Sequence, residues 1–319
     1  MKTKLSHSAI NMYKDCSLCF FLHYNKGIRP IRGKSALLFG GALDSALNHM
    51  LKTRNLNEAY NVFYAEWNKV DRDLTDFSKS DVDQDLIDIY GGEENPCPAW
   101  ISLQHKANLF LQAYYKDVLP KIKKVLVVQE PVSIKNSEGD EITGFLDLIA
   151  EWEDGKTYLL DNKTTSAKYT ENSAKESPQL ALYHYIMKDE YKLDGVGYIV
   201  MNKKINKNIV KRCKECFEIG YGSFRTCNAT YSKDGSLSAA KRCNGEFSVT
   251  MNPSVDVQII LSKLNEGLEE KTIEEFDKIN TLISNGIFDK KHNPNGKYGP
   301  CTYSTYYEGN PNFTKKEVK

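Results

Sequence analysis

The sequence predicts an α/β protein in which helices cover both faces of a central sheet. Residues 5–120 carry apolar side chains at helical spacing, as at Leu43, Leu47 and Leu51. From about residue 125 to 202 the pattern changes to short apolar runs that are separated by turn residues. These runs are apolar at adjacent as well as alternating positions, which is typical of strands buried on both faces.

The composition is that of an ordinary globular protein, with 319 residues, 40% hydrophobic and 27% charged residues, and a net charge of +1. It excludes a disordered chain, a collagen-like chain and a disulfide miniprotein. Because no apolar run reaches about 18 residues and the N-terminus is polar, we expect no membrane contact and no secretory signal. The expected location is the cytoplasm of a bacterium or of a phage-infected cell. Any nucleic-acid surface must come from local charge patterning.

Four helices are expected in the N-terminal part, with Ser6 or Ser8 as the first N-cap, and they cover about residues 8–24, 37–51, 56–70 and 100–118. The stretch from Lys69 to Pro98 is rich in Asp and Gly and is expected to be partly loop. Strands are expected at 125–134, with an interruption near Pro131, and at 142–152, 157–163 and 197–202.

Ser177-Pro178 predicts the start of a helix that runs to about Tyr191. A final helix is predicted from about Val255 to Ile283. We divide the chain into a helical N-terminal part (1–120), a core of sheet and helix (121–202), a cysteine-rich insertion (203–248) and a C-terminal helix and tail (249–319).

The strongest chemical signal is Asp161-Asn-Lys163, near the end of a predicted strand. Side chains alternate along a strand, so Asp161 and Lys163 share one face. A carboxylate that holds a divalent ion, beside a lysine that positions water and offsets phosphate charge, suits a phosphodiesterase. A surface salt bridge would explain this pair alone, but the neighbouring strands are strongly apolar, where a charged pair is costly without a role.

A second carboxylate, Asp147, lies on the preceding strand, and the hairpin register decides whether it can join the site. A two-residue turn would place Asp147 opposite Asn162, facing away from Asp161. A three-residue loop at 153–155 places Asp147 opposite Asp161, and Gly155 suits its left-handed position. We predict the three-residue loop, because it brings both carboxylates to one metal.

Gln179 and Tyr183 stand at positions i and i+4 of the predicted helix that follows Pro178, on one face. Their amide and phenol could contact a substrate or a catalytic side chain. Taken alone, they fit an ordinary amphipathic helix equally well.

Four groups of residues resemble the RecB-type branch of the PD-(D/E)XK nuclease superfamily, including its CRISPR-associated and phage exonuclease-like members. In chain order they are Ser6-x-Ser8-x-x-x-x-Tyr13-x-x-Cys16, the glycine-containing helix from Phe39 to Leu47, the hairpin with Asp147 and Asp161-x-Lys163, and Gln179-x-x-x-Tyr183. The resemblance covers about residues 5–200. It implies a restriction-endonuclease-like core, a mixed central sheet flanked by helices, with helical additions at both ends.

The resemblance implies that Asp147 and Asp161 are metal ligands, that Lys163 is the catalytic lysine, and that Gln179 and Tyr183 are the helix signature of this branch. The branch usually has a metal-binding His in the glycine-containing helix, where this chain has Asp44. His49 lies five residues further on, away from the buried stripe, so we favour Asp44 over His49 as the third ligand. An all-oxygen set favours Mg²⁺ or Mn²⁺.

Four cysteines lie in one short segment, at Cys213, Cys216, Cys227 and Cys243. A C-x-x-C pair supplies two ligands from one turn, and structural zinc closes such small loops. Because the segment has little apolar content, zinc would supply its folding energy, and we expect a small zinc-binding insertion rather than four free thiols.

Some members of the branch carry an iron–sulfur cluster held by an N-terminal cysteine and three C-terminal ones. Cys16 matches the first, but Cys301 is followed by Ser304 where a second thiolate would stand. We therefore expect no iron–sulfur cluster. Without a secretion signal, metal binding or plain thiols are expected in preference to disulfides.

Basic residues lie beside and within the cysteine-rich segment, and they include Lys203, Lys204, Lys207, Lys211, Arg212 and Arg225. Aromatic residues are interleaved with them, which suits phosphate contact with base stacking. A charge run is also often a simple solvated face.

Together these features predict a metal-dependent DNA nuclease that hydrolyses phosphodiester bonds, and the resemblance implies an exonuclease acting on DNA ends or single strands. One alternative is a non-catalytic, zinc-containing nucleic-acid-binding protein on a decayed nuclease fold. Another is a nuclease subunit that is active only in a recombination complex. The sequence lacks a helicase P-loop, so unwinding would need a partner.

Overall fold

The computed structural model describes residues 4–92, 94–135, 141–222, 230–231, 241–242, 245–289, 303, 306 and 308–316. Its longer helices are α1 (His7–Asp15), α3 (Ser35–Thr53), α4 (Leu56–Trp67), α5 (Gln84–Tyr90), α6 (Pro98–Asp117), α8 (Pro178–Met187) and α9 (Leu268–Ser284). Shorter helical segments are α2 (Ser17–Phe20), η1 (Phe21–Asn25), η2 (Lys79–Asp81), η3 (Leu119–Lys121) and α7 (Glu171–Lys175).

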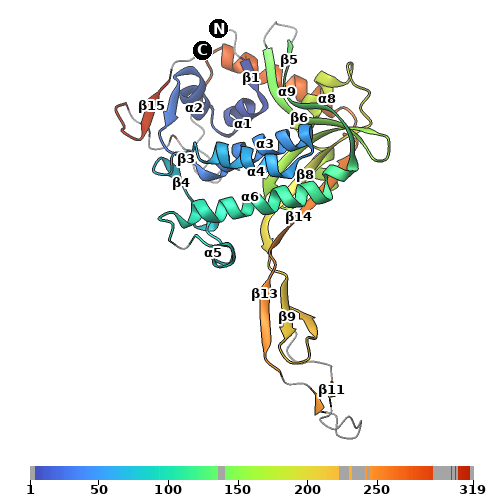
Figure 1. The fold of residues 1–319 in the computed structure, drawn as a ribbon. Coiled ribbons are helices and arrows are strands. Elements are labelled where there is room, and N and C mark those ends of the chain that lie inside the picture. Colours follow the sequence, from blue (N-terminus) through green and yellow to red (C-terminus); the bar gives the residue numbers. More distant parts are fainter. Residues whose placement is uncertain are drawn as a thin grey trace.

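A mixed six-stranded sheet forms the centre of the body (Figure 1). Its strands are β1 (Lys4–Ser6), β5 (Ile122–Lys135), β6 (Glu141–Trp152), β7 (Thr157–Thr165), β8 (Gly195–Asn206) and β14 (Ser254–Ser262). The order is β1-β6-β7-β8-β14, with β5 also paired to β6. The β7–β8 and β1–β6 pairs are parallel and the others antiparallel, so the predicted mixed central sheet is confirmed.

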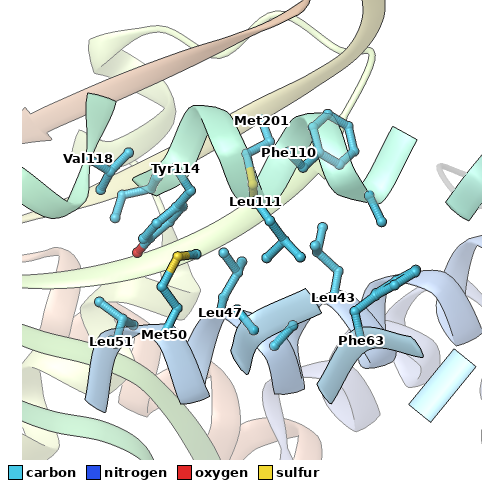
Figure 2. Close-up of a cluster of buried hydrophobic side chains, with 14 of the residues drawn as sticks. Leu43, Leu47, Met50, Leu51, Phe63, Phe110, Leu111, Tyr114, Val118 and Met201 are labelled. Carbon is cyan, nitrogen blue, oxygen red and sulfur yellow. The ribbon is translucent and has the colours of Figure 1, made fainter. Parts of the chain in front are cut away.

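Two separate hydrophobic clusters cover the two faces of this sheet, as the apolar strands predicted. On one face, α3, α4 and α6 pack through fully buried side chains such as Leu47 and Phe110 (Figure 2). On the other face, α1, α8 and α9 pack through residues such as Ile10, Leu180 and Phe276. Residues 5–120 are mostly helical, as expected.

Local sequence signals set several of these boundaries. The Ser6 hydroxyl accepts a hydrogen bond from the amide of Ala9 at 3.2 Å and caps α1. Ser177 caps α8 by accepting from the amide of Leu180 at 3.2 Å, with Pro178 at the first helical position.

The prediction of one long helix from Val255 to Ile283 is wrong. Residues 254–262 form β14, which pairs with β8, and α9 begins only at Leu268. Val255, Val257 and Ile259 alternate with polar residues, a period-two pattern of β-branched side chains that favours a strand. The Asp-rich stretch after Lys69 contains α5, a helix that the sequence did not indicate.

An extended arm projects from the body at the ends of β8 and β14 (Figure 1). Its three-stranded sheet consists of β10 (Ile219–Tyr221), β9 (Ile209–Cys213) and β13 (Phe247–Met251). Three two-stranded sheets complete the description, and they pair β11 (Thr230–Tyr231) with β12 (Lys241–Arg242), β15 (Phe313–Lys315) with β2 (Ile28–Pro30), and β3 (Gly33–Lys34) with β4 (Thr75–Asp76).

Candidate active site

The sheet forks where β7 separates from β6. Strand β5 pairs with β6 along one edge from residue 141 to 152. On the other edge, β7 pairs with residues 148–151 of β6, and β1 pairs with residues 141–143. Asp147 therefore lies between the two partners, at the point where β7 leaves.

The hairpin has the predicted three-residue loop. Ala150 pairs with Tyr158, and the amide of Trp152 donates to the carbonyl of Lys156 at 2.8 Å. Gly155 occupies the left-handed region with φ of 79°. This register, continued to the fork, sets Asp147 opposite Asp161, so the register prediction is confirmed.

Asp147 is tied to the neighbouring strand by its side chain. Its Oδ2 accepts a hydrogen bond from the backbone amide of Asn162 at 2.9 Å. Three residues earlier, Gly144 lies under the Tyr183 ring, so that an added Cβ would stand only 2.9 Å from the phenol oxygen. Glycine at this position allows α8 to approach the sheet beside Asp147.

Asp161, Lys163 and Gln179 form a closed polar triangle. Lys163 Nζ lies 2.7 Å from Asp161 Oδ2. Gln179 Nε2 donates to Asp161 Oδ1 at 2.8 Å, and its Oε1 accepts from Lys163 Nζ at 3.2 Å. The amide thus bridges both charged groups from α8. The Asp161 side chain is 3% exposed and that of Lys163 is 30% exposed, so the lysine forms the solvent-facing edge.

Asp44 comes to the site from α3, whereas His49 does not. Asp44 Oδ2 accepts from Gln129 Nε2 at 2.7 Å and from Asn48 Nδ2 at 3.1 Å. His49 lies 2.8 Å from Glu58 of α4, in an exposed pair. Asn48 and Gln129 were missed by the sequence reasoning; Asn48 had a usable signal, since it stands one helical turn after Asp44.

The three aspartates share a region of concentrated negative charge. Burial raises the pKa of Asp44 above its usual range; the Asn48 and Gln129 hydrogen bonds oppose this, and Asp161 adds to it. Burial, followed by the charges of Asp161 and Asp44, raises the pKa of Asp147 well above its usual range. Burial also raises the pKa of Asp161, although Lys163 opposes the change. Burial therefore makes each of the three carboxylates difficult to ionise.

Lys163 is held as a cation. Burial alone would lower its pKa, but the Asp161 and Asp147 carboxylates raise it above the usual value. Its ammonium also lies 5.9 Å from the centre of the Tyr198 ring. Burial raises the pKa of Tyr198 to about 12, so the phenol stays neutral, and its hydroxyl lies 2.6 Å from that of Ser177. A lysine in this state donates hydrogen bonds and does not serve as a base.

Tyr114 of α6 is fully buried beside Met50 of α3 (Figure 2). Its pKa is raised by burial and then by Asp147 and Asp44, and a hydrogen bond with the Asn162 side chain opposes this rise. Asn48 Oδ1 is buried without a hydrogen-bond partner among the described residues. An unpartnered buried oxygen is costly and marks a polar interior that water or an ion would satisfy.

The donor chemistry of the site fits a hard divalent cation. Three carboxylates face one lysine, and each carboxylate has a raised pKa that a cation would lower. Within the described ranges, however, no three His, Cys, Asp or Glu side chains already converge on a formed metal-binding group. Lys163 and Gln179 occupy the two oxygens of Asp161, so metal binding there would exchange at least one of these contacts.

Two of the four predicted zinc ligands can be located, and Cys227 and Cys243 lie outside the described residues. Cys213 and Cys216 share a tight turn after β9, in which the Cys216 amide donates to Cys213 Sγ at 3.4 Å. A Cβ on Gly245 would stand 2.7 Å from Cys213 Sγ, so glycine is needed there. Neither Cys213 nor Cys216 is part of a disulfide. Cys19, by contrast, is disulfide-bonded, contrary to the expectation of thiols.

The predicted basic residues follow β8 from the site into the arm. Lys163 on β7 is in register with Val200 on β8, only three residues before Lys203. Lys203 and Lys204 lie on β8, Lys207 follows it and pairs with Asp85, and Lys211 and Arg212 lie on β9. Arg225 lies outside the described residues. Tyr221 is on the same arm and is 74% exposed.

An α/β sheet that brings two aspartates and a lysine together at a strand fork is typical of divalent-metal nucleases. A profile of the PD-(D/E)XK nuclease superfamily matches residues 4–306, so this chain belongs to that superfamily. Membership implies nuclease activity, and the superfamily typically uses a divalent metal ion. No curated protein matches the sequence. In the part of the chain that the structure describes, no helix is both long and apolar enough to cross a bilayer.

We expect Asp147→Asn to stabilise the metal-free protein by about 0.5–2 kcal/mol, because it removes a buried charge that Asp161 and Asp44 also crowd. The same raised pKa means that the folded state binds the proton more tightly than the unfolded state. The stability of the metal-free wild type should therefore rise as the pH falls from above the raised pKa of Asp147 toward the usual pKa of an aspartate. Thermal unfolding in EDTA checks both expectations. The exposed Asp189→Asn serves as the control and should change nothing. Destabilisation by Asp147→Asn would contradict the crowding argument.

Proposed function

We propose that this chain is a metal-dependent deoxyribonuclease of the RecB-type branch that hydrolyses phosphodiester bonds, acting as an exonuclease on DNA ends or single strands. The observation that carries this proposal is the convergence of Asp147, Asp161 and Lys163 at the fork, with Gln179 bridging the last two. The choice of DNA and of exonuclease action rests on the sequence resemblance.

Asp147 and Asp161, with Asp44 as the third side chain, would hold Mg²⁺ or Mn²⁺. The ion, when bound, polarises the scissile phosphate and activates water. Asp147 is oriented by the amide of Asn162 and Asp161 by Gln179. Their positions are therefore set before substrate arrives, which reduces the reorganisation needed in the transition state.

Lys163 would stabilise charge on the phosphate and orient the attacking water. It keeps its proton because of the adjacent carboxylates, and its ammonium lies at the solvent-facing edge of the site. Gln179 fixes that ammonium through its carbonyl oxygen. Tyr183 packs on Gly144 and supports α8 at the same place.

The arm would contact the nucleic acid beyond the site. The lysines on β8 continue from the site toward the arm, where Arg212 and exposed Tyr221 stand on one face of the arm sheet. Phosphates would pair with the basic side chains, and bases would stack on the aromatic ring.

Zinc would stabilise the part of the arm beyond the outer end of β9. The amide-to-sulfur hydrogen bond at Cys213 and the small Gly245 beside it suit a thiolate held in a compact turn. Cys227 and Cys243 are proposed as the other two ligands.

A second candidate is a nuclease subunit that acts only with a recombination or helicase partner. The arm exposes large apolar side chains at Phe217, Ile219, Tyr221 and Val249. Exposed apolar surface of this kind often marks a protein interface. Cleavage that appears only when a partner is added would favour this candidate.

Lys163→Ala should lower cleavage by about 100- to 1000-fold, because it removes charge stabilisation at the phosphate. The measurement compares labelled linear single- and double-stranded DNA in Mg²⁺ or Mn²⁺, with EDTA as the metal-free condition. The product ladder separates exonuclease from endonuclease action. Unchanged folding and zinc content are the control. Tight DNA binding by the wild type without cleavage would favour the non-catalytic binding protein instead.

Lys203→Ala with Lys204→Ala should weaken binding of single-stranded DNA and lower the slope of log K against log salt by about 0.7 per lysine. Fluorescence anisotropy at several salt concentrations measures this slope. The matched control is Lys271→Ala with Lys278→Ala on α9, which should leave it unchanged. Equal slopes for both double variants would contradict the proposed contact between β8 and DNA.

Purified protein should contain one zinc ion per chain by elemental analysis, and Cys213→Ser should lose it. Because the arm projects away from the central sheet, the variant should retain the unfolding temperature of the body within a few degrees (Figure 1). Cys97→Ser is the control and should keep zinc. A wild type free of zinc, after purification without chelators, would reject the zinc site.

A further inference from the structure

Gln129 has an unusual backbone for its place in the sheet. It lies within β5, between Val128 paired with Leu148 and Glu130 paired with Leu146, and so stands opposite Asp147. Its φ is 48°, in the left-handed region that non-glycine residues rarely occupy. A strand interior gives no local reason for this conformation, and strained residues of this kind gather at functional sites.

The side chain of Gln129 forms a clamp on Asp44 together with Asn48. Gln129 Nε2 donates to Asp44 Oδ2 at 2.7 Å, and Asn48 Nδ2 donates to the same oxygen at 3.1 Å. Asn48 Nδ2 also donates to Gln129 Oε1. The two amides therefore hold each other as well as one carboxylate oxygen.

The clamp leaves the other oxygen of Asp44 available. No described residue donates a hydrogen bond to Oδ1 of Asp44. This oxygen is also not one of the fully buried polar atoms that lack a partner. The arrangement is also costly, because Asn48 Oδ1 is buried without a hydrogen-bond partner among the described residues. The left-handed backbone at Gln129 and the unpartnered oxygen of Asn48 are both unfavourable, and both belong to the arrangement that orients the Asp44 carboxylate.

We propose that Gln129 is a positioning residue, which with Asn48 aims the free oxygen of Asp44 at the divalent ion. The left-handed backbone at Gln129 is what brings its amide to α3. This inference rests on the proposed metal-dependent function and adds a specific requirement to it. Outer-shell partners of metal ligands typically change metal affinity by about 10- to 100-fold when they are removed.

Gln129→Gly separates positioning from a structural role, because glycine relieves the backbone strain while removing the amide. The expected result is an unchanged or higher unfolding temperature in EDTA, together with Mn²⁺ binding weakened by about tenfold or more in a titration without DNA. Gln129→Asn, which tolerates the left-handed region but is one methylene shorter, should weaken Mn²⁺ binding as well.

The matched control is Asn208→Gly at the base of the arm, where φ is 34° and the amide donates to Ser254 at 2.7 Å. It removes the same kind of strain and hydrogen bond and should leave Mn²⁺ binding unchanged. On an Asp44→Ala background, Gln129→Gly should cause no further loss, because its effect passes through Asp44.

The outcomes separate this inference from the proposed function. Mn²⁺ binding to the wild type that Gln129→Gly does not weaken would overturn the positioning role and leave the nuclease proposal standing. A further loss in the double variant would also overturn it, since Gln129 would then act independently of Asp44. A wild type that binds no Mn²⁺ at all would overturn the metal-dependent function itself.

Discussion

The separation of β7 from β6 is the constraint on which the candidate site depends. Beyond the fork β6 pairs with β1, while β7 continues beside β8 as far as Thr165. Among the described strands, none pairs with the other edge of β7 past Leu160, so the sheet opens there. The Asp147 side chain spans this gap, because its carboxylate accepts a hydrogen bond from the backbone amide of Asn162. The pairing of β6 with β7 and the side-chain contact of Asp147 therefore together fix where the carboxylates lie.

Several charged side chains gather at this gap between β6 and β7, and neighbouring elements hold them in position. Three aspartates and one lysine lie where two hydrophobic clusters meet the sheet from opposite faces. Amides supply most of the restraint, since Gln179 holds Asp161 and Lys163, while Asn48 and Gln129 hold Asp44. Neutral donors of this kind orient a carboxylate without neutralising its charge.

Sequence reasoning succeeded where local chemistry decides the structure. Gly155 and its neighbours set the loop and therefore the hairpin register, and Ser177-Pro178 set the start of α8. It failed at residues 255–262, where a helical pattern was assigned to a strand whose partner is distant in sequence. The sequence did not identify Gln129 for a similar reason. Its left-handed backbone angle and its contact with α3 are not indicated by any local periodicity. Residue type and order thus predicted which charged residues converge at the fork, but not the amides of α3 and β5 that hold them.

The place where the arm joins the body has its own consequence. β8 and β14 are antiparallel neighbours, with Asn206 paired to Ser254 at their shared end. Residues 207–253 are therefore the connection of a single β-hairpin, enlarged into an arm. A connection at such a point can lengthen, shorten or change its contents without shifting the register of any strand in the body. The length and contents of the arm are therefore independent of the strand pairing that brings Asp147 and Asp161 together.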